Sequence, residues 1–139
     1  MLVKNWMKRG SVTLEPELGV QHAFKLLNKH DIKQLPVLKD GLLVGIVTDR
    51  DLRRPKPDDG KLSRDPVYRL EDRFKVGDIM QTEVVNVKED TTIEEAEGLL
   101  IKHKINSLPV ISQNGELSGI ITASDILGAL VWLYKYKEA

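Results

Sequence analysis

The sequence contains no cysteine, and its three histidines, His22, His30 and His103, stand far apart. A chain without cysteine forms neither disulfides nor thiolate metal sites, and dispersed histidines do not provide the clustered ligands that zinc requires. At 139 residues, the chain is long enough to be held together by an apolar core alone. We therefore expect no metal site and no covalent cross-link.

A net charge of one sign is also lacking, because 21 basic residues balance 21 acidic residues. Such a chain has no overall field that would draw it onto nucleic acid or onto an anionic membrane. No apolar run approaches the ~20 residues of a membrane span, and the N-terminus has no apolar core of signal-peptide length. We expect a cytoplasmic protein that contacts no membrane and, in general, no nucleic acid.

Aromatic residues are scarce as well, at 5% of the chain. Trp6, Trp132, Tyr134 and Tyr136 are too scattered for a platform on which nucleic-acid bases stack, so we expect them to pack or to form a subunit contact. The last segment, residues 124–137, carries more apolar side chains than one helix face needs. This excess predicts contact with a second subunit or packing over the rest of the chain.

What the chain does contain is a long internal repeat. The second copy returns the residue types of the first copy in the same order and at nearly constant spacing. The matched positions are Met7 with Met80, 35–37 with 108–110, and 45–51 with 119–125. A repeat of this length and regularity indicates a duplicated supersecondary unit. Two copies of one surface packed face to face would create two related clefts.

Apolar spacing predicts the same order of elements in each copy: strand, helix, strand, strand, helix. In the second copy, residues 84–87 are a strand candidate, and a helical periodicity follows with a capping box at Thr91 and Glu94. Residues 108–111 and 117–121 are strands joined by a tight Asn-Gly turn, and an Asp-Gly pair does the same in the first copy. The predicted fold class is therefore α/β, or α+β, with helices on at least one face of each sheet.

The repeat also predicts the domain organisation. Residues 1–54 form the first repeat, and residues 75–139 form the second repeat with its C-terminal helix. Between them, residues 55–74 begin with a polar, proline-containing and aperiodic stretch that is typical of a linker. The two repeats together form one module.

Each repeat carries a threonine, and three residues later an aspartate, at the junction of an apolar strand and a helix. The N–H groups at such a junction attract anions, so Thr48 or Thr122 could donate to a phosphate beside them. Asp51 or Asp125 could accept from the two hydroxyls of a ribose. The same Thr-x-x-Asp pattern is also a helix-capping box, and a duplication copies caps as well as sites. Both interpretations stay open at this point.

The residues that recur resemble a tandem pair of CBS domains, the cystathionine-β-synthase-type repeats that form a Bateman module. The resemblance covers about residues 3–52 and 76–131. It rests on the two Gly-h-h-Thr-x-x-Asp stretches, the two Leu-Pro-Val strands and the alanine-containing helices. Within the family, residues 3–7 and 47–53 are similar to small bacterial CBS proteins of the acetoin-utilisation type.

The resemblance implies two CBS repeats packed sheet to sheet about a pseudo-twofold axis, with AMP, ADP, ATP or S-adenosylmethionine in the clefts. It implies that Thr48 and Asp51 contact phosphate and ribose in one cleft, as Thr122 and Asp125 do in the other. It also implies an adenine pocket built from backbone and apolar groups in each copy. The pocket residues are Val12, Lys33 and Gln34 in the first copy and Val85, Asn106 and Ser107 in the second.

The two motifs differ because Asp49-Arg50 in the first is replaced by an alanine and Ser124 in the second. Arg50, with Arg53 and Arg54 close by, could neutralise a phosphate chain, or these arginines are solvated or bridge subunits. Ser124 donates a hydrogen bond but carries no charge. We therefore expect unequal sites, of which the second prefers a monophosphate, a nucleoside or S-adenosylmethionine.

The carboxylates of Asp49 and Asp51 have no nucleophile or base beside them, so we expect no catalytic residue and no enzyme. The resemblance implies a stand-alone module that senses adenosyl ligands, forms a homodimer and signals to an unknown target protein by a conformational or oligomeric change. The alternative is a scaffolding protein with vestigial clefts that acts through its C-terminal helix. A third interpretation is a magnesium- or nucleic-acid-linked regulator that uses the cluster from Arg50 to Arg54.

Overall fold

The computed structural model describes residues 1–53 and 74–136, which belong to two compact units. One unit comprises Met1–Ser11 and Val85–Ala139, and we call it the C-terminal unit. The other comprises Val12–Val84, and we call it the N-terminal unit. The opening segment of the chain therefore belongs to the same unit as the second Thr-x-x-Asp motif.

Each unit thus contains a short segment from the sequence of the other repeat. Residues 1–11 of the first repeat belong to the C-terminal unit, and residues 75–84 of the second repeat belong to the N-terminal unit. We call these two stretches the exchanged segments. The repeat boundaries 1–54, 55–74 and 75–139 stay a prediction. The predicted linker, apart from its last residue, lies outside the described residues.

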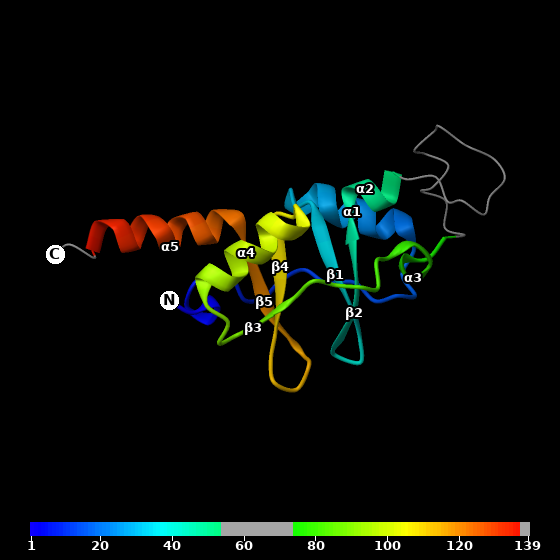
Figure 1. Ribbon diagram of the computed structural model, residues 1–139. Coiled ribbons are helices and arrows are strands. Elements are labelled where there is room, and N and C mark those ends of the chain that lie inside the picture. The colour runs from blue at the N-terminus through cyan, green and yellow to red at the C-terminus, as the bar shows by residue number, and fades with distance from the viewer. Residues whose placement is uncertain (54–73, 137–139) are drawn as a thin grey trace. The chain divides into compact units, whose positions relative to one another are not determined.

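The C-terminal unit follows the predicted order of strand, helix, strand, strand, helix. Its elements are the 3-10 turn η1 (Val3–Asn5), β3 (Val87–Lys88), α4 (Ile93–His103), β4 (Ser107–Ile111), β5 (Leu117–Thr122) and α5 (Ala123–Tyr136). The sheet has the order β3-β4-β5, with β3 parallel and β5 antiparallel to β4 (Figure 1). The predicted mixed α/β fold is confirmed.

Apolar side chains at helical spacing build the core of this unit. Ile93, Ala96 and Leu100 recur every three or four residues along α4 and are buried. They form one cluster with apolar residues of β4 and β5 and with Val3 of η1, which is fully buried. Burying one aliphatic side chain of this size stabilises a fold by about 1.5–3 kcal/mol. The opening segment is therefore part of the core.

The N-terminal unit has a similar plan, but its sheet has two strands where that of the C-terminal unit has three. Its elements are α1 (Val20–His30), β1 (Gln34–Lys39), β2 (Leu42–Thr48), α2 (Asp49–Arg53) and α3 (Val76–Ile79). β1 and β2 form an antiparallel hairpin whose turn residues, Asp40 and Gly41, have φ of +52° and +82°, as this type of two-residue turn requires. Figure 1 shows α1 and α2 at the end of the hairpin away from this turn. The motif lies at that same end.

The first strand predicted for this repeat is reduced to one parallel bridge between Leu14 and Val37. The N–H of Leu14 donates to the Pro36 carbonyl, and the Leu14 carbonyl accepts from the N–H of Leu38. Pro16 follows soon after and has no N–H to donate, so the ladder does not continue. The contact with β1 is made, but it is too short to count as a strand.

The capping box predicted at Thr91 and Glu94 is wrong by one residue. Thr92 is the N-cap of α4, and its hydroxyl accepts from the N–H of Glu95 at 3.1 Å. Thr91 accepts from the N–H of Lys88 at 3.0 Å and closes the turn after β3. Both threonines offer an acceptor, and the one next to the first helical residue is the cap.

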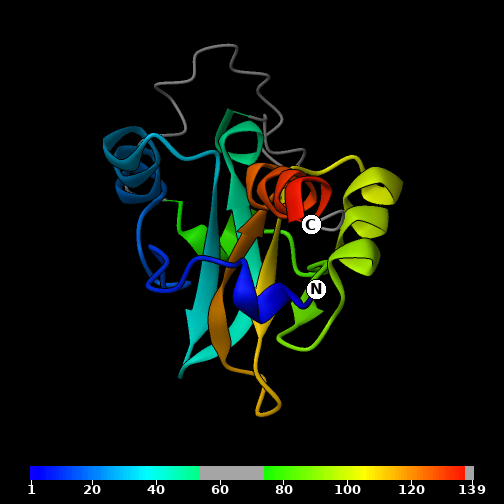
Figure 2. The same cartoon turned by 90° about the vertical axis from the view of Figure 1, so that its left-hand side faces the viewer.

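The exchanged segments pair with the hairpins at equivalent positions. Lys8 forms an antiparallel bridge with Ile120 of β5, and Gln81 forms one with Ile46 of β2. Figure 2 shows the opening segment, in blue, beside β5. In each bridge both backbone hydrogen bonds are 2.9–3.0 Å long. The chain thus brings one residue from each exchanged segment to the strand that leads into a motif.

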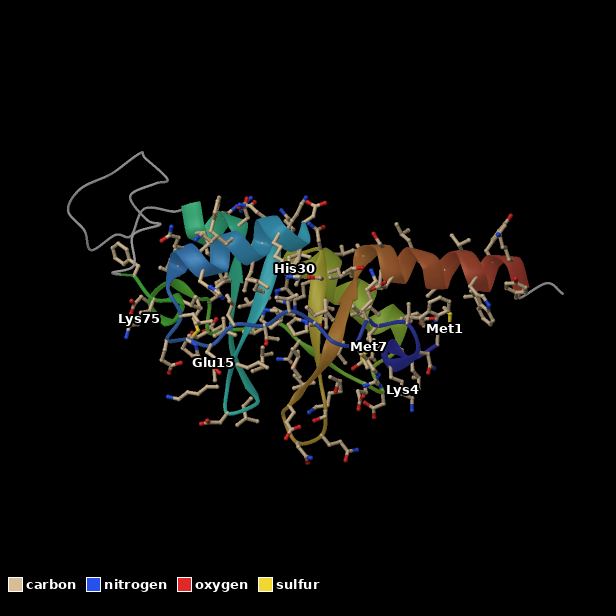
Figure 3. The ribbon with its side chains drawn as sticks, turned by 180° about the vertical axis from the view of Figure 1, so that it is seen from behind. Met1, Lys4, Met7, Glu15, His30 and Lys75 are labelled. Carbon is tan, nitrogen blue, oxygen red and sulfur yellow. The ribbon has the colours of Figure 1, made fainter. Side chains whose placement is uncertain are left out.

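Two glycines allow these segments to approach closely. A Cβ on Gly119 would collide with the carbonyl oxygen of Lys8, which is backbone. A Cβ on Gly45 would meet mainly the flexible side chain of Met80. Met7, labelled in Figure 3, holds the place of Met80 in the opening segment. These glycines are required by close packing, because neither has a positive φ.

Candidate functional site

The two Thr-x-x-Asp motifs have the same geometry in their respective units. The N–H of Thr48 donates to Oδ2 of Asp51 at 3.0 Å, and the N–H of Asp51 donates to Oγ1 of Thr48 at 3.1 Å. The corresponding distances between Thr122 and Asp125 are 2.9 and 3.2 Å. Each motif is therefore a reciprocal capping box at the start of α2 or α5.

The capping interpretation is thus confirmed, and it is compatible with ligand binding. A hydroxyl can donate one hydrogen bond while it accepts others, and a carboxylate can accept about four. The box fixes the orientation of both side chains in each motif. Groups that are held in place before a ligand arrives lose less entropy on binding. The motif is therefore a preorganised pair of one hydroxyl and one carboxylate.

Both carboxylates lie largely out of water. Asp51 is 7% exposed, and the side chain of Asp125 is 10% exposed. A carboxylate at such depth is costly unless polar or charged partners compensate it. The identity of those partners therefore governs what each carboxylate can bind.

Each carboxylate is contacted by one residue of an exchanged segment. Nε2 of Gln81 lies 3.0 Å from Oδ1 and 3.1 Å from Oδ2 of Asp51. Nζ of Lys8 lies 3.6 Å from Oδ1 of Asp125 and forms an ion pair with it. Asp51 thus has a neutral amide beside it, whereas Asp125 has a cation beside it.

Sequence reasoning missed both Lys8 and Gln81. The signal was present, because each residue directly follows a methionine of the repeat, Met7 or Met80. Spacing within a motif does not point to them, because 30 positions separate Gln81 from Asp51. A contact between an exchanged segment and a motif follows from the topology of the units and not from local spacing.

In the N-terminal unit, the structure brings the predicted pocket residues next to the motif. The carbonyl of Lys33 accepts from the N–H of Asp49 at 3.0 Å. Gln34 is the direct cross-strand partner of Thr48. Val12 is partly buried and packs against the core cluster of this unit. The predicted residues and the motif therefore meet at one end of the β1–β2 hairpin.

The C-terminal unit repeats this arrangement with different side chains. The carbonyl of Asn106 accepts from the N–H of Ala123 at 2.8 Å. Ser107 is the cross-strand partner of Thr122 and is 7% exposed. Val85 is partly buried against the core cluster of this unit. The backbone geometry around the two motifs is thus conserved between the units, whereas Gln34 is replaced by the smaller Ser107.

Gln34 has an unsatisfied polar atom beside the motif. Its Nε2 is buried and has no hydrogen-bond partner among the described residues. Leaving a buried donor without a partner costs about 1–3 kcal/mol, so such a group needs an explanation. Directly opposed residues of an antiparallel pair point to the same face, so the Gln34 amide and the Thr48 side chain lie on one face of the hairpin.

The residues inside the motifs differ as the sequence indicates. Arg50 and Ser124 are exposed, and Asp49 is half-buried. α2 ends at Arg53, and Arg54 lies outside the described residues. Of the predicted arginine cluster, Arg50 is therefore the residue whose side chain the structure places, and it is exposed to solvent.

Neither a metal centre nor a membrane span is found in the parts of the chain that the structure describes. Within 1–53 and 74–136, no three His, Cys, Asp or Glu side chains are grouped so that they could hold an ion. No described helix is both long enough and apolar enough to cross a bilayer.

The profile of the CBS domain matches residues 3–56 and 76–131, which carry the two copies of the repeat. The matched segments cover more than half of the chain. The chain belongs to the CBS-domain family. It is a tandem CBS pair, and each of its two Thr-x-x-Asp motifs lies in one matched segment.

This CBS pair covers nearly all of one relative and only a small part of another. The CBS domain-containing protein DDB_G0289609 of Dictyostelium discoideum is 36% identical over 134 residues, which are 94% of this chain and 92% of that protein. The inosine-5'-monophosphate dehydrogenase of Korarchaeum cryptofilum is 36% identical over 124 residues, which are 88% of this chain but 23% of that enzyme. The match to the enzyme thus concerns a small part of it and does not extend its activity to the CBS pair.

Two solved CBS structures resemble this one over nearly its whole length. CBSX2 from Arabidopsis thaliana, determined in complex with AMP, has a TM-score of 0.78 and 29% identity, and the match covers 96% of this chain and 98% of that one. A Vibrio cholerae protein assigned to acetoin utilization, AcuB, has a TM-score of 0.79 and 27% identity, with coverage of 99% and 96%. The predicted resemblance to acetoin-utilisation-type CBS pairs is confirmed.

Proposed function

We propose that this CBS pair is a regulatory module, not an enzyme, that binds adenine nucleotides at its two motifs. The observation that carries the proposal is the same preorganised threonine–aspartate pair in both units. The structural likeness to CBSX2, which was determined with AMP, supports an adenosyl ligand. The unsatisfied amide of Gln34 beside Thr48 supports a ligand with hydrogen-bond acceptors at that place.

In the proposed binding mode, each chemical part of the nucleotide meets a group of matching chemistry. The ribose hydroxyls donate to Asp51 or Asp125, because a carboxylate accepts strongly from hydroxyls. The phosphate accepts from the hydroxyl of Thr48 or Thr122. The adenine ring lies against the strand residues. These residues are Val12, Lys33 and Gln34 in one unit and Val85, Asn106 and Ser107 in the other.

Regulation requires a difference in affinity between conformational states. A nucleotide that binds one arrangement of the module better than another shifts the population toward that arrangement, and a target protein can respond to the change. Asp49, Arg50 and Ser124 lie next to the binding residues in sequence and belong to the proposed sites. S-adenosylmethionine as a ligand, the target protein and the cytoplasmic location stay predictions.

Thermal unfolding with a ligand panel tests the proposed function. At about 100 times its dissociation constant, a ligand should raise the free energy of unfolding by about 2.7 kcal/mol. We expect AMP, ADP or ATP to raise Tm, and GMP, as the matched control, to raise it less. The panel should also contain NADH, diadenosine polyphosphates and S-adenosylmethionine. If no member of the panel changes Tm, the sensing function is contradicted.

Gln34→Leu should separate the contribution of Gln34 to binding from its contribution to stability. Leucine removes the unsatisfied donor at similar volume, so the free energy of unfolding should stay equal or rise by about 1 kcal/mol. The affinity for AMP should fall about fivefold, because the ligand loses one hydrogen bond. Denaturant unfolding and calorimetric titration measure the two quantities. A variant that is less stable but binds AMP as wild type does would indicate a purely structural glutamine.

The proposed homodimer rests on the exposed apolar side of α5. Large apolar side chains on this helix are exposed by about half or more of their surface: Leu127 62%, Val131 53%, Trp132 48%, Tyr134 83% and Tyr136 58%. Exposed apolar surface of this kind is typical of a protein interface. We propose that this helix contacts a second copy of the chain.

Replacing Leu127 and Val131 together with lysine should convert the proposed dimer to a monomer. Two buried charges at an interface cost far more than the apolar contacts contribute, so the dissociation constant should rise more than 100-fold. Ile101→Lys is the matched control, because Ile101 is 70% exposed on α4. Sedimentation velocity measures the mass of all three proteins. A wild-type monomer, or a dimer that tolerates both lysines, would contradict the proposed interface.

A further inference from the structure

The two carboxylates of the motifs differ in the partner that each receives from an exchanged segment. Asp125 has the ammonium group of Lys8 at 3.6 Å, and Asp51 has the amide of Gln81 at 3.0 Å. Lys8 and Gln81 are equivalent by the repeat, by their backbone bridges to Ile120 and Ile46, and by the carboxylates that they contact. The exchanged segments therefore bring a cation to one carboxylate and a neutral amide to the other, at equivalent positions.

The geometry leaves the Lys8 ammonium able to serve a second anion. The side chain of Lys8 is 73% exposed, whereas that of Asp125 is 10% exposed. An ion pair with one exposed partner is weak and is screened by salt, so it does not lock the lysine in place. An ammonium group also has three donors, of which a single carboxylate oxygen takes one. Lys8 can thus remain near Asp125 and still donate to an anionic group bound there.

The positive charge of Lys8 changes which ligands can bind next to the Asp125 carboxylate. A carboxylate alone repels a nearby phosphate, and a cation next to it offsets that repulsion. Ser124, inside the motif, carries no charge, so Lys8 is the cation that the described structure provides at this carboxylate. A neutral nucleoside gains nothing from the ammonium group, and a cationic ligand is disfavoured by it.

We propose that Lys8 makes the Thr122–Asp125 site selective for anionic adenine nucleotides over neutral nucleosides and cationic adenosyl compounds. The inference rests on the proposed function, because it assumes that an adenosyl ligand binds at Asp125. The expectation from Ser124 is that this second site prefers a monophosphate, a nucleoside or S-adenosylmethionine. With Lys8 taken into account, the monophosphate stays in that set, and the nucleoside and S-adenosylmethionine become the weaker ligands. At the Asp51 site, Gln81 holds the same position without a charge.

The test compares AMP with adenosine at the Asp125 site alone. Calorimetric titrations use the full chain with Asp51→Asn, so that the other site is weakened. Lys8→Gln on this background introduces the residue that the chain itself uses at the equivalent position, so the fold should tolerate it. The ratio of AMP affinity to adenosine affinity should fall about fivefold, and the salt dependence of AMP binding should decrease.

Two further variants test whether the change in the AMP-to-adenosine affinity ratio depends on a positive charge at the position of Lys8. Lys4→Gln removes the same charge from an exposed residue of η1 and should leave the ratio within about twofold. Gln81→Lys on an Asp125→Asn background should raise the ratio at the Asp51 site about fivefold, which a damaged fold cannot mimic. A ratio unchanged by Lys8→Gln, or by Gln81→Lys, while AMP still binds, would overturn the role of Lys8 and leave the proposed function intact. If Asp51→Asn abolishes binding of both ligands altogether, nucleotide binding at Asp125 itself fails, and the inference fails with it.

Discussion

Replacing Asp51 or Asp125 with asparagine should weaken AMP binding at the affected site about tenfold or more, with little loss of stability. The amide oxygen of asparagine can still accept from the N–H of Thr48 or Thr122, so each capping box is kept. The free energy of unfolding should therefore fall by less than about 1 kcal/mol. The charged acceptor for the ribose hydroxyls is lost, and hydrogen bonds to charged groups contribute about 1.5–3 kcal/mol.

The control for this prediction is a capping aspartate outside the motifs. Asp78 in α3 accepts from the N–H of Lys75 at 2.9 Å, which is the half of the box that Asp51 and Asp125 also make. Lysine has no acceptor, so the other half is missing there. Asp78→Asn should change stability as little as the motif variants do and should leave AMP affinity within about twofold. Titration calorimetry and urea unfolding give both quantities for each variant. If all three variants lose stability equally and none loses affinity, the motifs act only as caps.

Gly119→Ala should be among the most destabilising single changes in the chain, with a loss of about 3 kcal/mol or more. The added Cβ collides with the backbone carbonyl of Lys8, and that carbonyl is fixed by its hydrogen bond to Ile120 at 2.9 Å. Gly45→Ala should cost less, about 1–2 kcal/mol, because the Met80 side chain can move aside. Gly98→Ala should gain up to about 1 kcal/mol, since α4 offers open space there.

Urea unfolding of the three alanine variants measures this order directly. Because the Lys8 segment pairs with β5 at Ile120, the residue after Gly119, Gly119→Ala should also weaken AMP binding at Asp125 beyond its effect on stability. Circular dichroism at the temperature of the titration establishes that the variant is folded. A Gly119→Ala protein as stable as the Gly98→Ala protein would contradict the close approach of the opening segment to β5.

Local patterns in the sequence were sufficient for most of the fold. Helical periodicity located α4, and the Asp40-Gly41 pair located the β1–β2 turn, because a two-residue turn with positive φ at both positions favours these residue types. The choice between Thr91 and Thr92 as N-cap could not be made, because both offer the same chemistry one residue apart. The strand predicted at the start of the N-terminal unit is reduced to one bridge, because Pro16 has no N–H with which to continue the ladder.

The candidate site was predicted less completely than the fold. Thr48 and Asp51 are only three positions apart, as are their counterparts, and the repeat marks both pairs. Lys8 and Gln81 reach the motifs only because short segments are exchanged between the repeats. Such long-range pairing leaves no local signature, although the matched positions Met7 and Met80 marked where to look. The expectation of unequal sites therefore rests on Arg50, Arg53 and Arg54 in one copy and on Ser124 in the other, and it leaves out Lys8 and Gln81.

The most direct test of nucleotide binding at the motifs is a calorimetric titration of AMP into the wild type and into the Asp51→Asn, Asp125→Asn double variant. The wild type should bind AMP, and the double variant should lose at least about 90% of the affinity while it stays folded. Equal affinity in both proteins, or no binding by the wild type, would contradict the assignment of the two motifs as adenine-nucleotide sites.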